Sequence, residues 1–325
     1  MTMSGNDRPT GNGALSRLGI GEWGQKARIP RRRWSATKRE DFWTGLICLT
    51  PTLLITLVFF ILPVIFSFYL SFHHWNILKP DKPFVGLDNY RRMFATDEFW
   101  AALKNTVLYT IGVVPIGAMI SLLLALLLNQ KIRGLYFYRT AYFMPVITST
   151  IVVAVVWTWI YNPYYGLINI VLKMFKLPQP GWLVDPEWAL PAIIIMSIWK
   201  NMGYHMVIFL AGLQNIPQVY YEAAAIDGAG RLAQFRYITW PMLRPTTALV
   251  LMTSIIFSFQ VFGPVYVMTG GGPMRRTTVL LYYIYQRGFE FKEMGYASAV
   301  AWVLFFIIFA VTLVQFRYSR RGVGE

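Results

Sequence analysis

Six long apolar runs are the feature of this sequence that most limits its fold. They cover residues 42–72, 105–128, 140–161, 189–213, 246–268 and 297–316. Each run exceeds the roughly 18 residues that indicate a helix able to span a bilayer. Lipid offers no hydrogen bonds to an exposed backbone, so a spanning segment must satisfy its own N–H and C=O groups, as a helix does. We therefore predict an all-α polytopic membrane protein with six transmembrane helices.

The composition agrees with a membrane protein. Of the 325 residues, 56% are hydrophobic and only 14% are charged, which is unlike an average soluble domain. The formal net charge of +15 would suit nucleic acid, but the basic residues lie mainly in the tails and in short loops between the apolar runs. That distribution is typical of membrane topology. We expect lipid and no nucleic acid as a partner, and the single cysteine, Cys48, excludes an intrachain disulfide.

The positions of the basic residues predict the orientation of the chain. Eighteen of the thirty lysines and arginines fall in residues 1–41, 129–139, 214–245 and 317–325. Six spans place both termini on one side, and the excess of Lys and Arg predicts that this side is cytosolic. The predicted organisation is a disordered basic tail (1–41), a transmembrane domain (42–317) and a short tail (318–325), with both tails in the cytosol.

The loop at 217–245 is a polar, helix-prone segment between two apolar runs. Glycine reaches positive φ without steric cost, so Gly228 is expected to end a first helix at roughly 218–227. A second helical piece is expected to run to about Thr239 and to end at Pro241. Glu222 stands beside three alanines, whose small side chains would let another surface approach the backbone. The alternative is an ordinary interfacial helix–turn–helix between two spans.

Sequence motifs for catalysis or for ATP binding are absent. The sequence contains no GxxxxGK[ST] and no GxSxG, and its three histidines form no metal-ligand spacing. We expect no catalytic residue and no metal or cofactor on this chain. None of the fifteen carboxylates lies within the six runs. Proton-coupled carriers usually place acidic residues there, so a secondary transporter is disfavoured and the driving energy is expected to come from a partner.

Polar residues inside the fourth run mark a candidate solute pathway. Lys200 lies near its middle, in the segment WKNMGYH, with Asn201, Tyr204 and His205 nearby. An ionisable group at this depth is costly and is by default a functional hypothesis. Two interpretations remain open, namely hydrogen bonding that holds the helix bundle together and lining of a substrate path.

The fifth run carries a second candidate face. Ser254, Phe257, Ser258 and Val261 share one side of a helix, and Gln260 flanks them. An aromatic ring beside hydroxyl and amide groups suits a sugar, whose ring stacks on the aromatic while its hydroxyls need hydrogen-bond partners. The alternative is that the aromatic side chains belong to the core of the bundle.

Several of these segments resemble a known family. The spacing of Glu222-Ala223-Ala224, Gly228, Ile238 and Pro241 resembles the EAA signature of permease subunits in bacterial ABC importers, with Trp240 where leucine is usual. Four more segments resemble carbohydrate-uptake permeases of the maltose and glycerol-phosphate type: FVGLDNYRRMF (84–94), MPVITSTIVVAVVW (144–157), GLQNIP (212–217) and SFQVFGPVYVMTGGGP (258–273). The resemblance covers roughly residues 40–320, and Gly263 stands where such permeases often have aspartate.

The resemblance implies a function and a set of site residues. The chain would be a translocation-pathway subunit of an ATP-driven sugar importer in the bacterial cytoplasmic (inner) membrane, with its ABC type-1 core at about 102–316. Its cytosolic coupling helix, with Glu222, Ala223, Ala224, Asp227 and Gly228, would fit a groove on the ATPase. Substrate-pathway candidates are Asn201, Tyr204, Ser254, Phe257, Ser258, Gln260 and Val261.

The resemblance also implies the partners. They are a second homologous permease, a dimer of ATPase subunits that holds ATP and Mg, and an extracytoplasmic sugar-binding protein. The alternatives are an ABC permease for another small solute, a secondary transporter, or a membrane scaffold that transports nothing.

Overall fold

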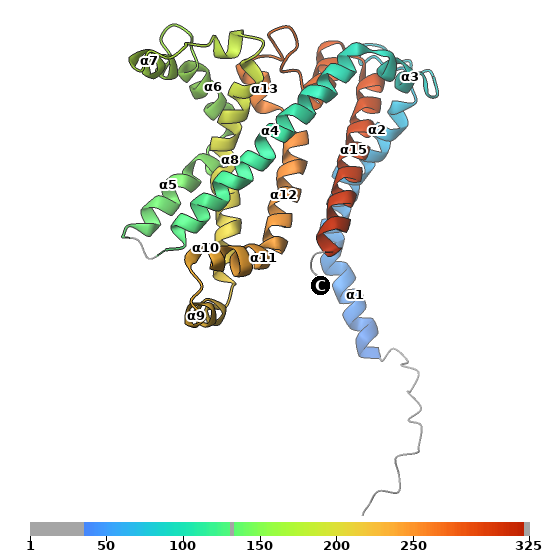
Figure 1. Cartoon of the computed structure of the whole chain (residues 1–325). Helices are drawn as coiled ribbons and strands as arrows, with labels where there is room; N and C mark the ends of the chain where they lie inside the picture. The colour runs from blue at the N-terminus through green and yellow to red at the C-terminus, as the bar shows by residue number, and fades with distance from the viewer. Residues whose placement is uncertain (1–35, 131–132, 322–325) are drawn as a thin grey trace, which may run out of the picture. The chain divides into compact units, whose positions relative to one another are not determined.

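The computed structural model describes residues 36–130 and 133–321. Apart from two isolated β-bridges, regular secondary structure in these ranges is helical (Figure 1). The contacts within the chain divide it after Leu62 into two compact units. Most of the predicted tail at 1–41 lies outside the described residues, but its last part already belongs to the first helix.

The first unit contains the start of the first apolar run. Helix α1 spans Ala36–Thr56 with Pro51 inside it, and a π-helical turn follows at Leu57–Ile61. Helix α2, Leu62–Ser71, continues the run, and the stretch Phe42–Ser71 is long and apolar enough to cross a membrane. This agrees with the predicted first span. Its apolar side chains are largely exposed, as expected for a helix that faces lipid.

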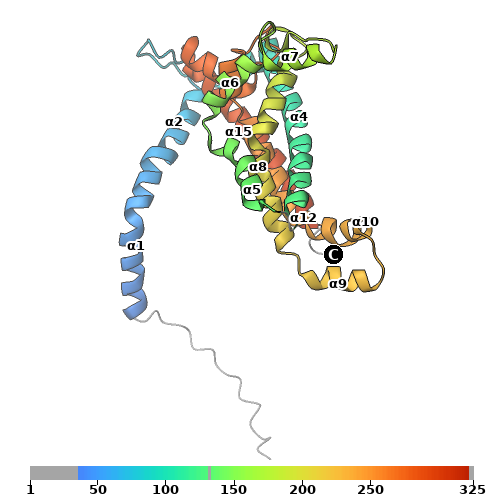
Figure 2. The same ribbon diagram turned by 90° about the vertical axis from the view of Figure 1, so that its left-hand side faces the viewer.

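The second unit is built around long helices that pack side by side. Its principal helices are α4 (Asp97–Leu128), α8 (Ala189–Gln214), α12 (Arg244–Phe259) and α15 (Met294–Arg321). Helix α4 packs along α8, α12 packs against both, and α15 packs against α12 (Figures 1 and 2). Three of these, α4, α8 and α15, are long enough to be spans by themselves. They correspond to the predicted second, fourth and sixth spans, although α4 begins earlier than expected, at Asp97.

The third apolar run is broken, whereas a single helix at 140–161 was predicted. Helix α5, Leu135–Ile147, and helix α6, Thr150–Ile160, meet at 99°. The hydroxyl of Thr148 donates to the Met144 carbonyl at 3.2 Å, so a side chain takes a carbonyl at the end of α5. Hydroxyl side chains that compete for carbonyls in this way favour a helix end.

The fifth run is also interrupted, which corrects the expected helix at 246–268. Helix α12 ends at Phe259, and a short helix α13, Gly263–Met268, follows. Pro264 explains the position of the break, because a proline lacks an N–H and its ring clashes with the carbonyl four residues earlier, here that of Gln260. Besides α5 and α6, the helical stretches Arg231–Met242 and Arg244–Phe259 form a second bent pair, at 63°, and if each pair counts as one span the described chain has up to six candidate spans.

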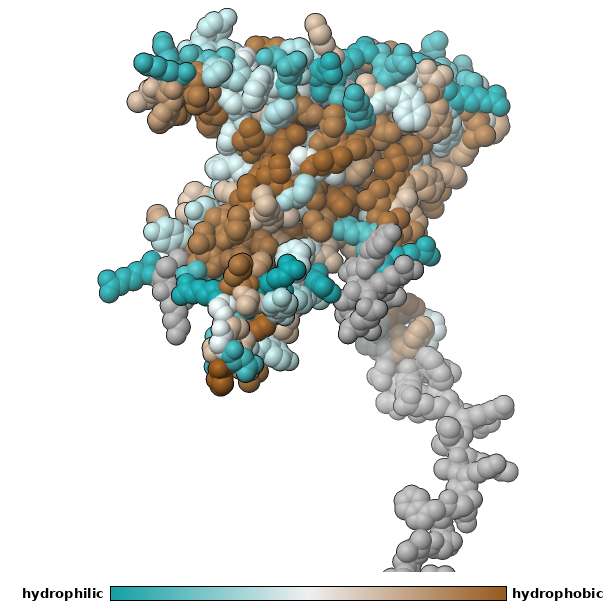
Figure 3. Space-filling model, in the orientation of Figure 1, coloured by the Kyte–Doolittle hydropathy of each residue, from teal (hydrophilic) through white to brown (hydrophobic). Residues whose placement is uncertain are grey.

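Shorter helices gather at the two ends of the second unit. One end carries α3 (Asp88–Ala95), α7 (Leu167–Met174), a 3₁₀ turn (Trp182–Val184), α14 (Leu280–Tyr285) and a π turn (Gln286–Glu290). The opposite end carries α9 (Gln218–Ile226), α10 (Arg231–Gln234), a π turn (Phe235–Thr239) and α11 (Trp240–Met242). Hydrophobic side chains cover the region between the two polar ends (Figure 3).

One close helix contact sets the position of the broken span. A Cβ added at Gly203 of α8 would lie 2.1 Å from the Tyr142 carbonyl oxygen, so the backbones of α8 and α5 touch there. Only glycine leaves room for this approach. The contact brings the end of α5, and hence the α5–α6 break, against the middle of α8.

Candidate functional site

The predicted coupling loop forms a short exposed helix and a sharp turn. Helix α9 holds Glu222, Ala223 and Ala224, Asp227 follows its last residue, and Gly228 has φ of +79°. The predicted helix end at Gly228 is therefore confirmed. Glu222 is exposed and forms no ion pair with another described residue.

The second half of this loop differs from the prediction. The helix does not end at Pro241 but passes through it, because the π turn at Phe235–Thr239 leads directly into α11. The wider turn uses a bond from Trp240 N–H to the Phe235 carbonyl. The hydroxyls of Tyr221 and Thr239 are 2.9 Å apart and join α9 to this turn. The loop is thus an ordered unit attached to α8 at one end and to α12 at the other.

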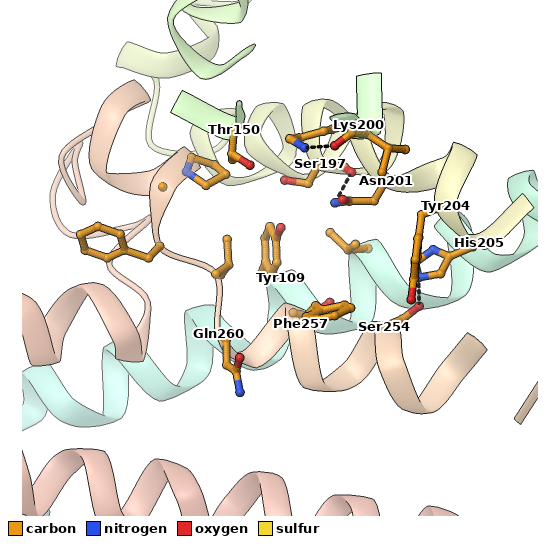
Figure 4. A pocket seen from close by; sticks show the side chains of 17 residues that line it. Tyr109, Thr150, Ser197, Lys200, Asn201, Tyr204, His205, Ser254, Phe257 and Gln260 are labelled. Atoms are coloured by element: carbon orange, nitrogen blue, oxygen red, sulfur yellow. Dashed lines mark hydrogen bonds between the residues drawn. The ribbon is translucent and has the colours of Figure 1, made fainter. Parts of the chain in front are cut away.

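A cavity of about 500 Å³ lies among α4, α6, α8, α12 and the segment that leads into α13 (Figure 4). The structure brings all seven predicted pathway residues to its wall: Asn201, Tyr204, Ser254, Phe257, Ser258, Gln260 and Val261. Val261 lies beyond the end of α12, so the cavity rather than one helical face unites these positions. Whether the residues contact a solute stays a prediction.

Other lining residues were not singled out from the sequence. They are Tyr109, Val113, Val146, Thr150, Ser197 and Pro264. Tyr109, Thr150 and Ser197 are polar groups inside predicted spans, and that signal could have identified them. Nothing in the sequence shows that they meet, since they come from three different helices.

Lys200 is the charged group of this cavity. The residue is 7% exposed, and its ammonium donates to the Val146 carbonyl at 3.4 Å, at the end of α5. No aspartate or glutamate is among the lining residues. Both interpretations of Lys200 thus keep support, because it lines the cavity and also contacts a second helix.

Two further polar contacts order the wall. His205 Nε2 and Ser254 Oγ are 2.9 Å apart and connect α8 to α12. The Asn201 amide donates to the Ser197 carbonyl at 2.9 Å. Both contacts hold polar side chains in fixed orientations around the cavity. Among the residues with described positions, no group of His, Cys, Asp and Glu is arranged to hold a metal ion.

A cluster of charges lies at the end of the unit opposite the coupling loop. Glu98 forms ion pairs with Arg275 and Arg287, and Glu293 pairs with Arg92 at 2.7 Å and with Arg287 at 3.4 Å. Burial lowers the pKa of Arg287, but contacts with Tyr283 and Glu98 outweigh burial and raise that pKa overall. The cluster fastens the loop before α14 to the first turn of α4.

Comparison with known proteins relates these features to transporters. A family model described as binding-protein-dependent transport system inner membrane component matches residues 98–322. The trehalose/maltose transport system permease protein MalF of Thermococcus litoralis is 36% identical over 88% of this chain and 97% of its own length. The sn-glycerol-3-phosphate transport system permease protein UgpA of Pectobacterium atrosepticum is 32% identical over 87% and 96%.

A solved structure shares the fold. It is described as a bacterial ABC transporter involved in the import of the acidic polysaccharide alginate, with a TM-score of 0.77 and 26% sequence identity. The match covers 88% of this chain and 98% of that chain.

Proposed function

This chain belongs to the family of binding-protein-dependent transport system inner membrane components, and we propose that it forms part of the translocation pathway of an ATP-driven sugar importer. The observation that carries the proposal is the cavity between the helices, lined by hydroxyl, amide and aromatic groups. Two similar proteins, one named for trehalose and maltose and one for alginate, support a carbohydrate as the solute.

The chemistry of the cavity suits a sugar ring. Phe257 offers an aromatic face, while Ser258, Asn201 and Gln260 offer hydroxyl and amide groups. A sugar needs both, because its C–H face is apolar and each buried hydroxyl requires a hydrogen-bond partner. These four groups are neutral and come from α8 and from α12 with its C-cap, so they can hold a sugar ring without binding it too tightly for release.

A second, homologous permease would complete the pathway. Phe257, Gln260 and Asn201 line the cavity and yet remain exposed in this chain, so the cavity opens to the surface along α12. Closure by another permease would bury these side chains and enclose the solute. An extracytoplasmic sugar-binding protein would deliver the sugar at the end opposite the coupling loop.

The coupling loop connects an ATPase to the cavity through the covalent chain. The loop joins α8, which carries Asn201 and His205, to α12, which carries Ser254 and Ser258. A dimer of ATPase subunits, with its ATP and Mg, would bind around Glu222 on the cytosolic side. Movement of α9 would then shift the two helices that supply much of the cavity wall, and so alternate access to it.

Uptake by the reconstituted complex tests this proposal. Glu222→Lys should block ATP-driven uptake of a labelled sugar that the unaltered complex transports, because it reverses the charge offered beside the three alanines. Glu222→Gln, which keeps the shape and removes the charge, serves as the matched control and should lose less. Normal uptake by Glu222→Lys would count against the coupling assignment, provided that the variant is present in the membrane at the usual level.

The same assay separates the alternatives. A secondary transporter would lose uptake when the proton gradient is dissipated at constant ATP, whereas the proposed importer would keep it. A permease for another solute would hydrolyse ATP in response to that solute and not to sugars. A scaffold would show no solute-dependent ATP hydrolysis in the complex.

A further inference from the structure

We propose that the corner of the cavity formed by Lys200, Ser197 and the first turn of α6 binds an anionic group of the solute. The transported compound would then be an acidic sugar, with a carboxylate, phosphate or sulfonate group. This inference rests on the proposed transport function and narrows its substrate class. It is carried by three observations about the same corner (Figure 4).

The first observation is a buried cation without an anion. Lys200 is only 7% exposed, yet the one hydrogen bond of its ammonium to a described residue is long, at 3.4 Å from the Val146 carbonyl. An ammonium has three donors and no acceptor. Buried charges in proteins are normally paired, because an unpaired one loses its hydration without compensation. No acidic side chain lines the cavity, so an anion on the solute is the missing partner.

The second observation is a buried hydroxyl on the same face of α8 that has no partner in hydrogen-bond geometry among the described residues. Ser197 lies three residues before Lys200, and residues three apart on a helix are neighbours on its surface. It is 2% exposed, lines the cavity, and its hydroxyl makes no hydrogen bond to another described residue. The phenol of Tyr109 lies close enough to interact with this hydroxyl, but not in the geometry of a hydrogen bond. A buried hydroxyl without a partner costs free energy that a bound acceptor would recover.

The third observation is the open N-terminus of α6. The first bond inside this eleven-residue helix runs from Val153 N–H to the Ser149 carbonyl, so the N–H groups of Thr150, Ile151 and Val152 have no intrahelical acceptor. Ser149 supplies no side-chain cap. Thr150 lines the cavity. Free N–H groups and the positive end of the helix dipole favour an anion.

Together these groups give the corner donors in excess and a net positive charge. Broken membrane helices use the same principle when a half-helix N-terminus faces an anionic substrate. The similar proteins do not decide the matter. One is named for glycerol-3-phosphate and one for an acidic polysaccharide, whereas the trehalose/maltose protein is named for neutral sugars.

A purely structural role for Lys200 makes a different prediction. The Val146 carbonyl belongs to the end of α5, where a cation stabilises the unpaired carbonyls and the negative end of the helix dipole. If Lys200 only holds the α5–α6 break in place, its removal distorts the cavity for every solute. Charged and uncharged solutes would then lose affinity to the same degree.

Two matched probes distinguish these roles, methyl glucuronide and methyl glucoside, which differ by one carboxylate. Binding is measured by equilibrium dialysis with the complete transporter in lipid nanodiscs, without nucleotide. We expect the glucuronide to bind about tenfold more tightly, as one charge-assisted hydrogen bond allows. Lys200→Met should abolish this preference, and Lys200→Arg should retain it.

Gly263 allows an independent test that leaves Lys200 in place. A Cβ at this position would meet the Thr150 methyl group at 3.5 Å, an ordinary contact, so a side chain fits beside the first turn of α6. Gly263→Asp places a carboxylate there and should weaken glucuronide binding about tenfold more than glucoside binding. The isosteric Gly263→Asn should weaken both probes equally.

The outcomes separate the inference from the transport function. Equal affinity of the unaltered complex for both probes, or equal weakening of both by Lys200→Met, overturns the anion site and leaves sugar transport standing. Absence of binding by both probes, together with absence of sugar uptake, overturns the proposed function as well. If Lys200→Met fails to assemble, a glucuronide preference that Gly263→Asp leaves unchanged overturns the inference.

Discussion

The coupling loop and the cavity both carry polar groups in a largely apolar chain, and they differ in how far their side chains are exposed to solvent. In the loop, Glu222 is exposed, and Ile226 and Leu232 are 87% and 80% exposed. In the cavity, Lys200 and Ser197 are 7% and 2% exposed. The loop presents side chains outward on a short helix, whereas Lys200 and Ser197 line a cavity between several helices.

The difference indicates what each region can bind. Exposed apolar side chains beside charged ones suit a large partner that covers them, because burial of the whole surface supplies the binding energy. Buried donors around a small volume suit a solute that enters without surrounding water. The covalent link between the regions, through α8 and α12, explains how binding at one could change the other.

The largest expected effect comes from breaking the loop. Gly228 has φ of +79°, which proline cannot adopt, and its N–H donates to the Ala225 carbonyl at 3.1 Å. Gly228→Pro should therefore abolish ATP-driven uptake while membrane insertion is retained. Gly228→Asn is the matched control, since asparagine tolerates positive φ and no atom lies within 4 Å of an added Cβ. Comparable uptake by both variants would contradict the role of this turn.

A large effect on stability is expected where α8 touches α5, beside the cavity. Gly203→Ala forces a Cβ to within 2.1 Å of the Tyr142 carbonyl oxygen, so backbone must move. The expected cost is roughly 3 kcal/mol, seen as a lower thermal midpoint of the purified complex. Gly117→Ala serves as the control, because its Cβ would meet only Ile198 at 3.9 Å. Equal midpoints for the two variants would show that α5 and α8 do not touch as described.

A smaller effect is expected inside the cavity. Ser258 is 4% exposed and lines the wall, and leucine would occupy the space of a solute. Ser258→Leu should raise the sugar concentration for half-maximal uptake about tenfold, as loss of roughly 1.4 kcal/mol would. Ser258→Ala removes the hydroxyl without adding volume and should change it less. Unchanged uptake by the leucine variant would remove this residue from the pathway.

The smallest effect on stability is expected at the charge cluster. Its Glu98 side chain is less exposed than the exposed side chains of the coupling loop and more exposed than Lys200 and Ser197 in the cavity. The Glu98 side chain is 30% exposed and pairs with Arg275 and Arg287, and Arg287 keeps Glu293 as a second partner. Glu98→Gln should cost less than about 1 kcal/mol, because partly exposed ion pairs are screened by water. The loss of stability is measured by thermal unfolding of the complex in low and in high salt. If Glu98→Gln lowered the free energy of unfolding by several kcal/mol, the ion pairs of the cluster would have to be as little screened by water as a buried pair.

Local features of the fold were predictable from the sequence. Gly228 shows this most clearly, because the need for positive φ acts on one residue and its neighbours. The break between α12 and α13 was missed although Pro264 gives a local reason for it. The helix through Pro241 was missed because the π turn before it changes the hydrogen-bond pattern, and propensity alone does not indicate such a turn.

The bend between α5 and α6 was missed for a different reason. It is associated with contacts from α8, where Lys200 reaches Val146 across 54 positions of sequence and Gly203 touches Tyr142. Similarly, the predicted pathway residues came from two apolar runs. Tyr109 and Thr150 line the same cavity only because the fold packs α4 and α6 against those runs.

The sequence by itself determined the helical membrane class, the positions of most spans and the exposed helix at Glu222. It could do so because lipid forces each spanning segment to satisfy its backbone hydrogen bonds locally, which leaves a readable run of apolar residues. Only the tertiary structure decided the bend between α5 and α6 and the cavity around Lys200. A cavity depends on the packing of helices that are distant in the chain, and no local pattern of residues records which of their side chains will face the same space.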